Sequence, residues 1–187
     1  AYNYPYDPQH PRKNMDYTNY DEDIWVGYRY FSTAGKEVSY PFGYGLSYTT
    51  FAYSNAKVSQ SANGFTATVT VKNTGKTAGK ETVELYISAP RGTLAKPVRE
   101  LKAFAKTRLL APGESQTLTM TFSSYDIASF DEATSSWVAD AGLYKAQFGA
   151  SVEDIRAAAP FTLAKAAVFK AHNVMAPAPG LNILKVN

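Results

Sequence analysis

The chain has 187 residues, of which 45% are hydrophobic and 19% are charged. These values are typical of a globular protein and exclude a disordered chain. The net charge is only +3, and the one basic cluster, Arg12-Lys13, is too small for a nucleic-acid interface. Cysteine is absent, which excludes disulfides and thiol chemistry. No apolar run approaches the length that crosses a membrane, so we predict neither nucleic acid nor membrane as a partner.

Residues 1–20 are rich in proline and tyrosine and show little apolar periodicity. The prolines preclude a helix, so we expect an ordered but irregular arm. Its tyrosine rings could stack on sugars, but packing against a neighbouring domain is the simpler interpretation. The segment lacks the basic and apolar regions of a signal peptide and looks like the interior of a longer protein.

Residues 21–31 alternate in the manner of a β-strand, with Ile24, Val26 and Tyr28 on one face and further apolar residues on the other. Such a strand needs a cover on both faces, and the chain offers no obvious partner for it. We therefore predict that residues 1–48 belong to a domain whose larger part lies elsewhere. Ala34-Gly35-Lys36 is predicted to form a turn.

Residues 40–51 combine several aromatic rings with Gly43 and Gly45. Glycine permits backbone angles that are closed to other residues and allows neighbouring groups to approach closely, while Pro41 favours an extended entry. The segment contains no nucleophile with a base, no pair of acids and no ligand cluster. We interpret it as an aromatic connector docked between two domains.

From Thr49 onward the sequence has the alternation of half-buried β-strands, and Asn63-Gly64 is a hairpin signal. Turn signals recur at short intervals, and about seven short strands predict an antiparallel β-sandwich. Strands are also expected at 101–110 and at Trp137-Val138. The inward-facing sets are predicted to be Phe65, Ala67, Val69 and Val71; Val83, Leu85 and Ile87; Leu118, Met120 and Phe122; and Tyr144, Ala146 and Phe148.

The last segment differs from the rest of the chain. Residues 164–171 fit either a short helix or a continuing strand, and the prolines that follow preclude a helix throughout. We expect an extended tail that lies along another surface, with Leu181, Ile183 and Leu184 as anchors.

Two segments resemble the C-terminal region of glycoside hydrolase family 3, which contains β-glucosidases and related exo-acting β-glycosidases. They are Val26-Gly27-Tyr28-Arg29-Tyr30-Phe31 and Pro41-Phe42-Gly43-Tyr44-Gly45-Leu46-Ser47-Tyr48-Thr49-Thr50-Phe51. In that family these segments close an α/β-sandwich domain and lead into a fibronectin type III-like domain. Later segments, among them Asn73-Thr74-Gly75 and Leu110-Ala111-Pro112-Gly113-Glu114, are similar to that second domain.

The resemblance implies a mainly β chain. Its fold would be a fibronectin III/immunoglobulin-like antiparallel β-sandwich preceded by the tail of an α/β-sandwich domain. Residues 1–48 would be that tail and a linker, residues 49–163 the fibronectin type III-like domain, and residues 164–187 an extended C-terminal tail.

The resemblance also implies an activity for the whole enzyme, namely retaining hydrolysis of terminal, non-reducing β-linked glucose without a cofactor. The family's catalytic Asp and Glu lie in a (β/α)8 barrel and earlier in the α/β-sandwich domain, at positions that this chain does not contain. We therefore expect a companion polypeptide that carries the barrel and most of the α/β-sandwich domain and binds most of the oligosaccharide substrate. A homodimer of the whole enzyme and a periplasmic or secreted bacterial location fit the same resemblance.

The residues themselves offer little chemistry. Adjacent carboxylates in Asp21-Glu22-Asp23 point apart on a strand or turn and make a poor catalytic pair. His10 and His172 lack the partner spacing of a metal site, and the acids after Asp126 form no calcium-loop pattern. We predict no catalytic, cofactor-binding or metal residue, and a chain that is inactive alone.

Four residues are candidates for a domain interface or a pocket rim: Trp25, Tyr28, Arg29 and Tyr44. Arg29 in aromatic surroundings is suited to stacking or pairing across an interface. Two other interpretations stay open at this point. The chain could be a stand-alone carbohydrate-binding or adhesion β-sandwich, or a spacer domain without a ligand.

Overall fold

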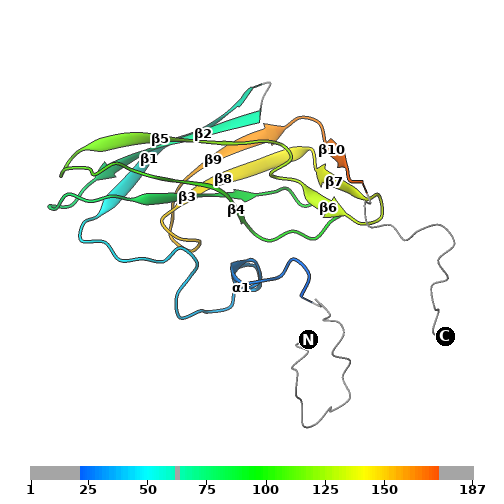
Figure 1. The fold of residues 1–187 in the computed structure, drawn as a ribbon, viewed down its shortest axis with the longest axis horizontal. Helices are drawn as coiled ribbons and strands as arrows, with labels where there is room; N and C mark the ends of the chain where they lie inside the picture. The colour runs from blue at the N-terminus through cyan, green and yellow to red at the C-terminus, as the bar shows by residue number, and fades with distance from the viewer. Residues whose placement is uncertain (1–21, 62–63, 173–187) are drawn as a thin grey trace, which may run out of the picture.

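The computed structural model describes residues 22–61 and 64–172 and consists mainly of β-strands (Figure 1). One short helix precedes the strands, and among the described residues no helix is long and apolar enough to span a membrane. The elements are α1 (Tyr28–Ala34), β1 (Phe51–Ser61), β2 (Gly64–Asn73), β3 (Thr82–Ser88), β4 (Glu100–Lys106), β5 (Ser115–Phe122), β6 (Ser129–Asp131), β7 (Ser136–Ala139), β8 (Gly142–Gly149), β9 (Ile155–Leu163) and β10 (Ala167–Lys170).

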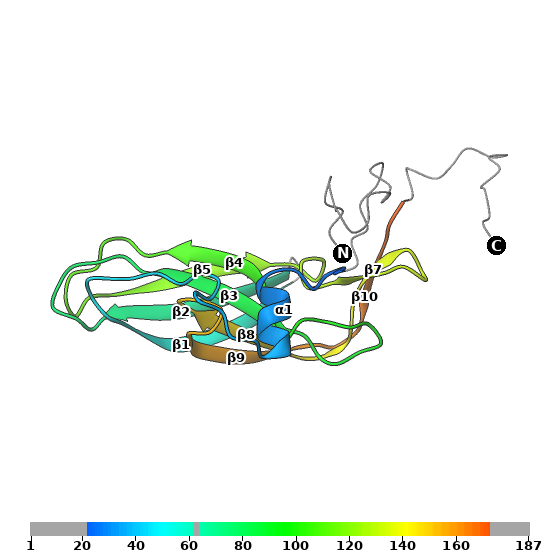
Figure 2. The same ribbon diagram turned by 90° about the horizontal axis from the view of Figure 1, so that it is seen from below.

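Two antiparallel sheets form the sandwich that the sequence predicts. One sheet has the strand order β1-β2-β5 and the other the order β4-β3-β8-β9. Figure 1 shows α1 below the sandwich, and Figure 2 shows it lying across the strands seen from that side. The predicted fold class, a mainly β antiparallel sandwich, is confirmed.

The core lies between these two sheets, and every predicted inward-facing set is buried there. Side chains alternate between the faces of a strand, so every second residue of β2 enters the core while its threonines face outward. The largest fully buried core side chains are Tyr144, Phe148, Leu85, Leu110, Val69, Val71 and Val83.

The hairpin expected at Asn63-Gly64 is present, because Ser61 pairs with Gly64 as β1 turns back into β2. Residues 62–63 themselves lie outside the described residues. β1 contains an irregularity between Ser54 and Lys57, where Asn55 has a φ of 53°. A bulge of this kind inserts an extra residue and interrupts the alternation of side chains.

The described chain contains ten strands rather than about seven. β6, β7 and β10 form a separate three-stranded sheet in the order β10-β7-β6. Of the two alternatives for residues 164–171, the strand is correct, since β10 pairs with β7. The anchors predicted in the tail after residue 172 lie outside the described residues, as does the arm of residues 1–20.

The strand predicted for residues 21–31 is wrong, because residues 22–24 form a turn and Tyr28–Ala34 form α1. Gly27, with a φ of 59°, precedes the helix, and Gly35 ends it in the left-handed conformation. Tyr28, Tyr30 and Phe31 are distributed around the helix instead, whereas Ile24, Trp25 and Val26 precede it. The turn predicted at Gly35 is confirmed.

We expect Phe148→Ala to lower the free energy of unfolding by about 3–5 kcal/mol, because Phe148 is fully buried between the sheets and its loss leaves a cavity. Urea unfolding measures the change. Phe104→Ala is the control, since Phe104 on β4 is 71% exposed and its truncation should cost less than about 1 kcal/mol. Equal losses in the two variants would contradict this location of the core.

Candidate domain-docking site

Residues 22–50, which we call the linker, pack against the outer face of the sheet β4-β3-β8-β9 (Figure 2). One face of α1 makes the polar contacts, because residues four apart lie on the same side of a helix. The N–H of Leu101 donates to the Tyr28 hydroxyl at 2.9 Å, and Arg29 forms an ion pair with Glu100 at 3.2 Å. One turn further along the helix, the Ser32 hydroxyl donates to Glu153 at 2.6 Å, and the N–H of Val98 donates to Thr33 Oγ1 at 3.0 Å.

Tyr28 is at the centre of the aromatic packing beneath the linker. Its ring lies 4.8 Å from the ring of Phe42 and 6.0 Å from that of Tyr86, measured between centroids. Tyr86 is fully buried although it does not belong to the core between the sheets. The linker therefore covers the outer side of β3 with an aromatic cluster of its own.

Gly43 allows the linker to approach β3 closely. Its φ is 82°, in the left-handed region, and a Cβ atom at this position would lie 2.3 Å from the carboxylate oxygens of Glu84. Next to it, the N–H of Val152 donates to the carbonyl of Phe42 at 2.9 Å. The backbone conformation therefore favours glycine, and a larger residue would in addition displace the carboxylate of Glu84.

Glu84 is the carboxylate beneath this glycine, and the hydroxyl of Tyr86 donates to it. Burial raises the pKa of Glu84, because desolvation disfavours the charged form, and the hydrogen bond from Tyr86 opposes that rise. The pKa of Tyr86 is also raised, first by burial and then by its bond to Glu84. The pair is a structural contact rather than an acid and a base facing open space.

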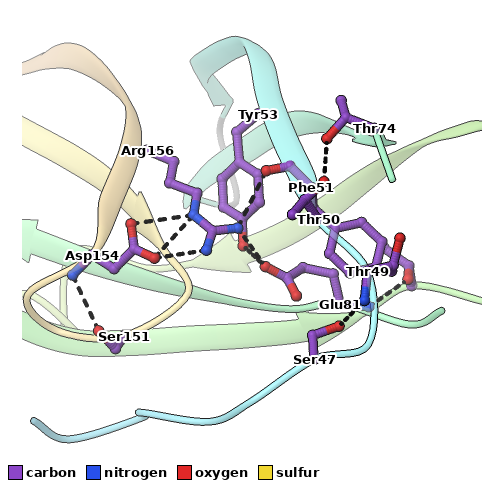
Figure 3. Close-up of polar contacts among 11 residues, drawn as sticks. Ser47, Thr49, Thr50, Phe51, Tyr53, Thr74, Glu81, Ser151, Asp154 and Arg156 are labelled. Carbon is purple, nitrogen blue, oxygen red and sulfur yellow. Dashed lines mark hydrogen bonds and ion pairs between the residues drawn. The ribbon is translucent and has the colours of Figure 1, made fainter. Parts of the chain in front are cut away.

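A second polar cluster holds the place where the linker enters β1 (Figure 3). Arg156 on β9 donates to Glu81 at 2.9 Å and to Asp154 at 2.6 Å, and its guanidinium carbon lies 5.2 Å from the ring centroid of Tyr53. The Tyr53 hydroxyl donates to Glu81 at 2.8 Å. Burial raises the pKa of Glu81, and the contacts with Tyr53 and Arg156 oppose this effect.

The end of the linker is also fixed to the loop after β2. The Thr49 hydroxyl donates to the side-chain carbonyl of Asn73 at 2.7 Å, and the hydroxyls of Thr50 and Thr74 are 2.9 Å apart. Gly75 is necessary here, since a Cβ atom would lie 2.2 Å from Thr49 Oγ1. The linker is therefore attached to the sandwich at both of its ends.

The linker also exposes many apolar side chains. Large hydrophobic side chains are exposed along it, and the exposed fractions reach 90% at Leu46 and 99% at Tyr48. An apolar surface of this extent marks a site of association. Apart from Phe42, whose ring packs against Tyr28, these exposed residues are Val26, Tyr30, Phe31, Val38, Tyr40, Tyr44, Leu46 and Tyr48.

The four predicted site residues are divided between the two sides of the linker. Tyr28 and Arg29 contact the sandwich, as described above. Tyr44 is 51% exposed with its ring 5.4 Å from that of Tyr40, and Trp25 is half-buried beside Tyr30. Whether Trp25 and Tyr44 contact another domain stays a prediction.

Sequence reasoning missed the residues that receive the linker, namely Glu84, Tyr86 and Val152. The sequence did contain a signal for the side of α1 that faces the sandwich. Tyr28 and Ser32 are four residues apart, as are Arg29 and Thr33, and residues at this spacing lie on the same side of a helix. In the described ranges, no group of three or more His, Cys, Asp or Glu side chains is positioned to hold a metal ion.

Comparison with known proteins shows that the chain is similar to part of β-glucosidases. The family model for the fibronectin type III-like domain matches residues 81–152. Beta-glucosidase A from Butyrivibrio fibrisolvens is 46% identical over 163 residues, which cover 75% of this chain and 20% of that protein.

Solved structures agree with this comparison. Beta-glucosidase 3B from Thermotoga neapolitana, in complex with glucose, is 47% identical with a TM-score of 0.78, over 81% of this chain and 21% of that one. The GH3 beta-glucosidase from Bifidobacterium adolescentis is 40% identical with a TM-score of 0.72, over 76% of this chain and 21% of that one. The chain thus spans about a fifth of the length of the relatives it matches.

The two sheets and the matched domain define a β-sandwich of the fibronectin type III-like class. With the linker that precedes this domain, the chain belongs to glycoside hydrolase family 3 and corresponds to the C-terminal region of its β-glucosidases. The family resemblance seen in the sequence is confirmed.

We expect Gly43→Ala to loosen the linker, because alanine is strained at a φ of 82° and its Cβ would displace the carboxylate of Glu84. If the substitution destabilises the docked linker by about 1–2 kcal/mol, the undocked linker becomes about tenfold more populated, and trypsin should cleave at Lys36 about tenfold faster. Gly45→Ala is the matched control, since its Cβ would meet no atom within 4 Å. Equal cleavage rates in the two variants would contradict the role given to Gly43.

The raised pKa of Glu84 predicts a pH dependence of stability. Above the ordinary value of 4.5 the unfolded chain has released this proton while the folded chain still binds it, so the contribution of Glu84 to stability falls as the pH rises. The free energy of unfolding of Glu84→Gln, relative to that of the unmodified chain, should therefore increase between about pH 4.5 and pH 7. Urea unfolding at several pH values tests this.

Glu114→Gln serves as a control of opposite sign. The N–H of Ala111, followed by Arg108, lowers the pKa of Glu114, so its stabilising effect is present above its ordinary pKa and is lost as the pH falls. The free energy of unfolding of Glu114→Gln, relative to that of the unmodified chain, should therefore decrease as the pH rises. The same trend in both variants would refute the assignment for Glu84.

Proposed function

We propose that this chain is the C-terminal structural portion of a retaining, exo-acting β-glycosidase that hydrolyses terminal, non-reducing β-linked glucose. A companion portion with a (β/α)8 barrel and most of an α/β-sandwich domain would carry the catalytic residues and bind most of the oligosaccharide. The 46% identity to a β-glucosidase supports the activity.

The observation that carries this proposal is the two-sided linker. Its inner side is bonded to the sandwich through Tyr28, Arg29 and Phe42, while its outer side exposes large apolar groups such as Phe31 and Leu46. Exposed apolar groups of this kind mark a site where another domain binds. The chain would therefore brace the catalytic domains by presenting the linker in one fixed orientation.

The carboxylates of the docking site support a structural rather than a catalytic role. A retaining glycosidase needs two carboxyl groups about 5–5.5 Å apart, one as nucleophile and one as acid and base. Here Glu81 and Asp154 both bind Arg156, and Glu84 accepts a hydrogen bond from Tyr86. Each of these carboxylates is therefore engaged in a contact that stabilises the linker or the loop beside it.

We also propose that the whole enzyme acts in the periplasm or outside a bacterial cell, where polymers supply terminal glucosyl residues. Separation of cell fractions, followed by an aryl β-glucosidase assay on each fraction, tests this location. Activity confined to the cytoplasmic fraction would contradict it.

A chimera tests the proposed function directly. We expect this chain to replace the matching C-terminal region of the Thermotoga neapolitana enzyme and to retain aryl β-glucosidase activity within about tenfold of the parent, since the two are 47% identical. Native mass spectrometry of the same chimera reports whether the whole enzyme forms the predicted homodimer. A folded but inactive chimera would contradict the proposal.

The outer side of the linker is tested in the same chimera. Phe31→Asp and Leu46→Asp should reduce the amount of assembled, active enzyme at least about tenfold, because each places a charge in a buried apolar interface. Lys72→Asp, an exposed position on the outer face of β2, is the control and should have no such effect.

A further inference from the structure

The small sheet β10-β7-β6 carries a row of aromatic side chains across its three strands. Phe130 on β6 lies directly opposite Trp137 on β7, and Phe169 on β10 lies opposite Trp137 from the other side. Directly opposed residues of antiparallel strands place their side chains on the same face. The ring centroids of Phe130 and Trp137 are accordingly 5.3 Å apart.

Tyr125, from the loop before β6, completes this row. Its ring lies 5.7 Å from that of Trp137 and 5.2 Å from that of Phe169. The rings are not closed off from solvent, since Tyr125 is 47%, Phe130 42% and Trp137 37% exposed. Figure 1 shows this sheet at one end of the sandwich.

Three of these rings line a groove of about 700 Å³, which we call the aromatic groove. This volume lies within the range of small-molecule sites. Its charged lining residues are of both signs, two cationic and five acidic: Arg29, Lys102, Asp23, Glu100, Asp126, Asp131 and Glu132.

Several of these charged groups are held in place by bonds at the rim. Glu100 pairs with Arg29 at 3.2 Å and with Lys102 at 3.3 Å. Asp131 accepts from the N–H of Ala133 at 3.0 Å. The groove therefore offers positioned carboxylate acceptors beside positioned cationic donors.

This combination identifies the chemistry of a ligand. Exposed rings match the flat, apolar C–H face of a pyranose, while sugar hydroxyls both donate and accept hydrogen bonds. Carboxylates such as Asp131 and Glu132 repel polyanions, whereas the hydroxyl groups of a neutral sugar can donate hydrogen bonds to them. The linker, by contrast, exposes large apolar side chains such as Leu46 and Tyr48, which is typical of a protein interface.

We infer that the aromatic groove binds the pyranose rings of a neutral, β-linked oligosaccharide. The choice of a glucosyl ligand rests on the proposed function. Trp137 and Phe130 contact the faces of the sugar rings, and Glu132 accepts a hydrogen bond from a hydroxyl group. The chain would then bind the substrate class of its enzyme with residues of its own.

Isothermal titration calorimetry of cellohexaose into the full 187-residue chain tests the inference. We expect saturable binding with a Kd below about 1 mM, and a loss of about tenfold or more in Trp137→Ala, which removes the central ring. Val168→Ala is the matched control, because Val168 is 63% exposed on β10 and belongs to the opposite face of the same sheet. It should bind as the unmodified chain does.

A second variant covers the case in which Trp137→Ala does not fold. Glu132→Ala removes an exposed side chain in the turn before β7 and should weaken binding several-fold while leaving the unfolding curve unchanged. Absence of saturable binding, or unchanged binding in both variants, would overturn the inference. Tighter binding of a glucosamine hexamer than of cellohexaose would also overturn it, since the groove would then select cations.

These outcomes are separable from the chimera experiment. Cellohexaose binding by the chain together with an inactive chimera would leave the groove as a sugar site and refute the proposed function. An active chimera together with no cellohexaose binding by the chain would support the proposed function and refute the sugar site in the groove.

Discussion

The arrangement of this chain depends on the covering of β3 on both of its faces. Val83 and Leu85 point into the core between the sheets, while Glu84 and Tyr86 lie on the outer face under the linker. Tyr86 is fully buried there, and Tyr28 packs against its ring. A central strand of this kind cannot leave its outer side in water, so the linker is part of the fold and not an appendage.

This constraint links folding to function. Because Tyr28 and Thr33 bond the edge of the sandwich and Thr49 bonds the loop after β2, the orientation of the linker is set by the sandwich itself. Its outer side is then presented as a preformed apolar surface, which lowers the entropic cost of association with another domain. The aromatic groove lies beside the start of the same linker, since Ile24 is one of its lining residues.

Much of the sandwich could be predicted from the sequence, because strands such as β2 alternate cleanly between core valines and outward threonines. β9 was missed because alanines and Pro160 weaken its alternation, although Phe161 enters the core. α1 was misread because its apolar residues surround the helix, so that a period of two fitted as well as a period of 3.6. The docking site depends on contacts distant in sequence, such as Gly43 with Glu84, which no local pattern reveals.

The central claim, that the linker docks on the sandwich within this chain, is tested most directly by amide hydrogen exchange. The N–H of Leu101, on the edge strand β4, and the N–H of Val152 both donate to linker groups, the Tyr28 hydroxyl and the Phe42 carbonyl. Both amides should exchange at least about a hundredfold more slowly than in an unstructured peptide, which corresponds to about 2.7 kcal/mol of local stability. Exchange at unprotected rates, with the core strands still protected, would contradict the claim.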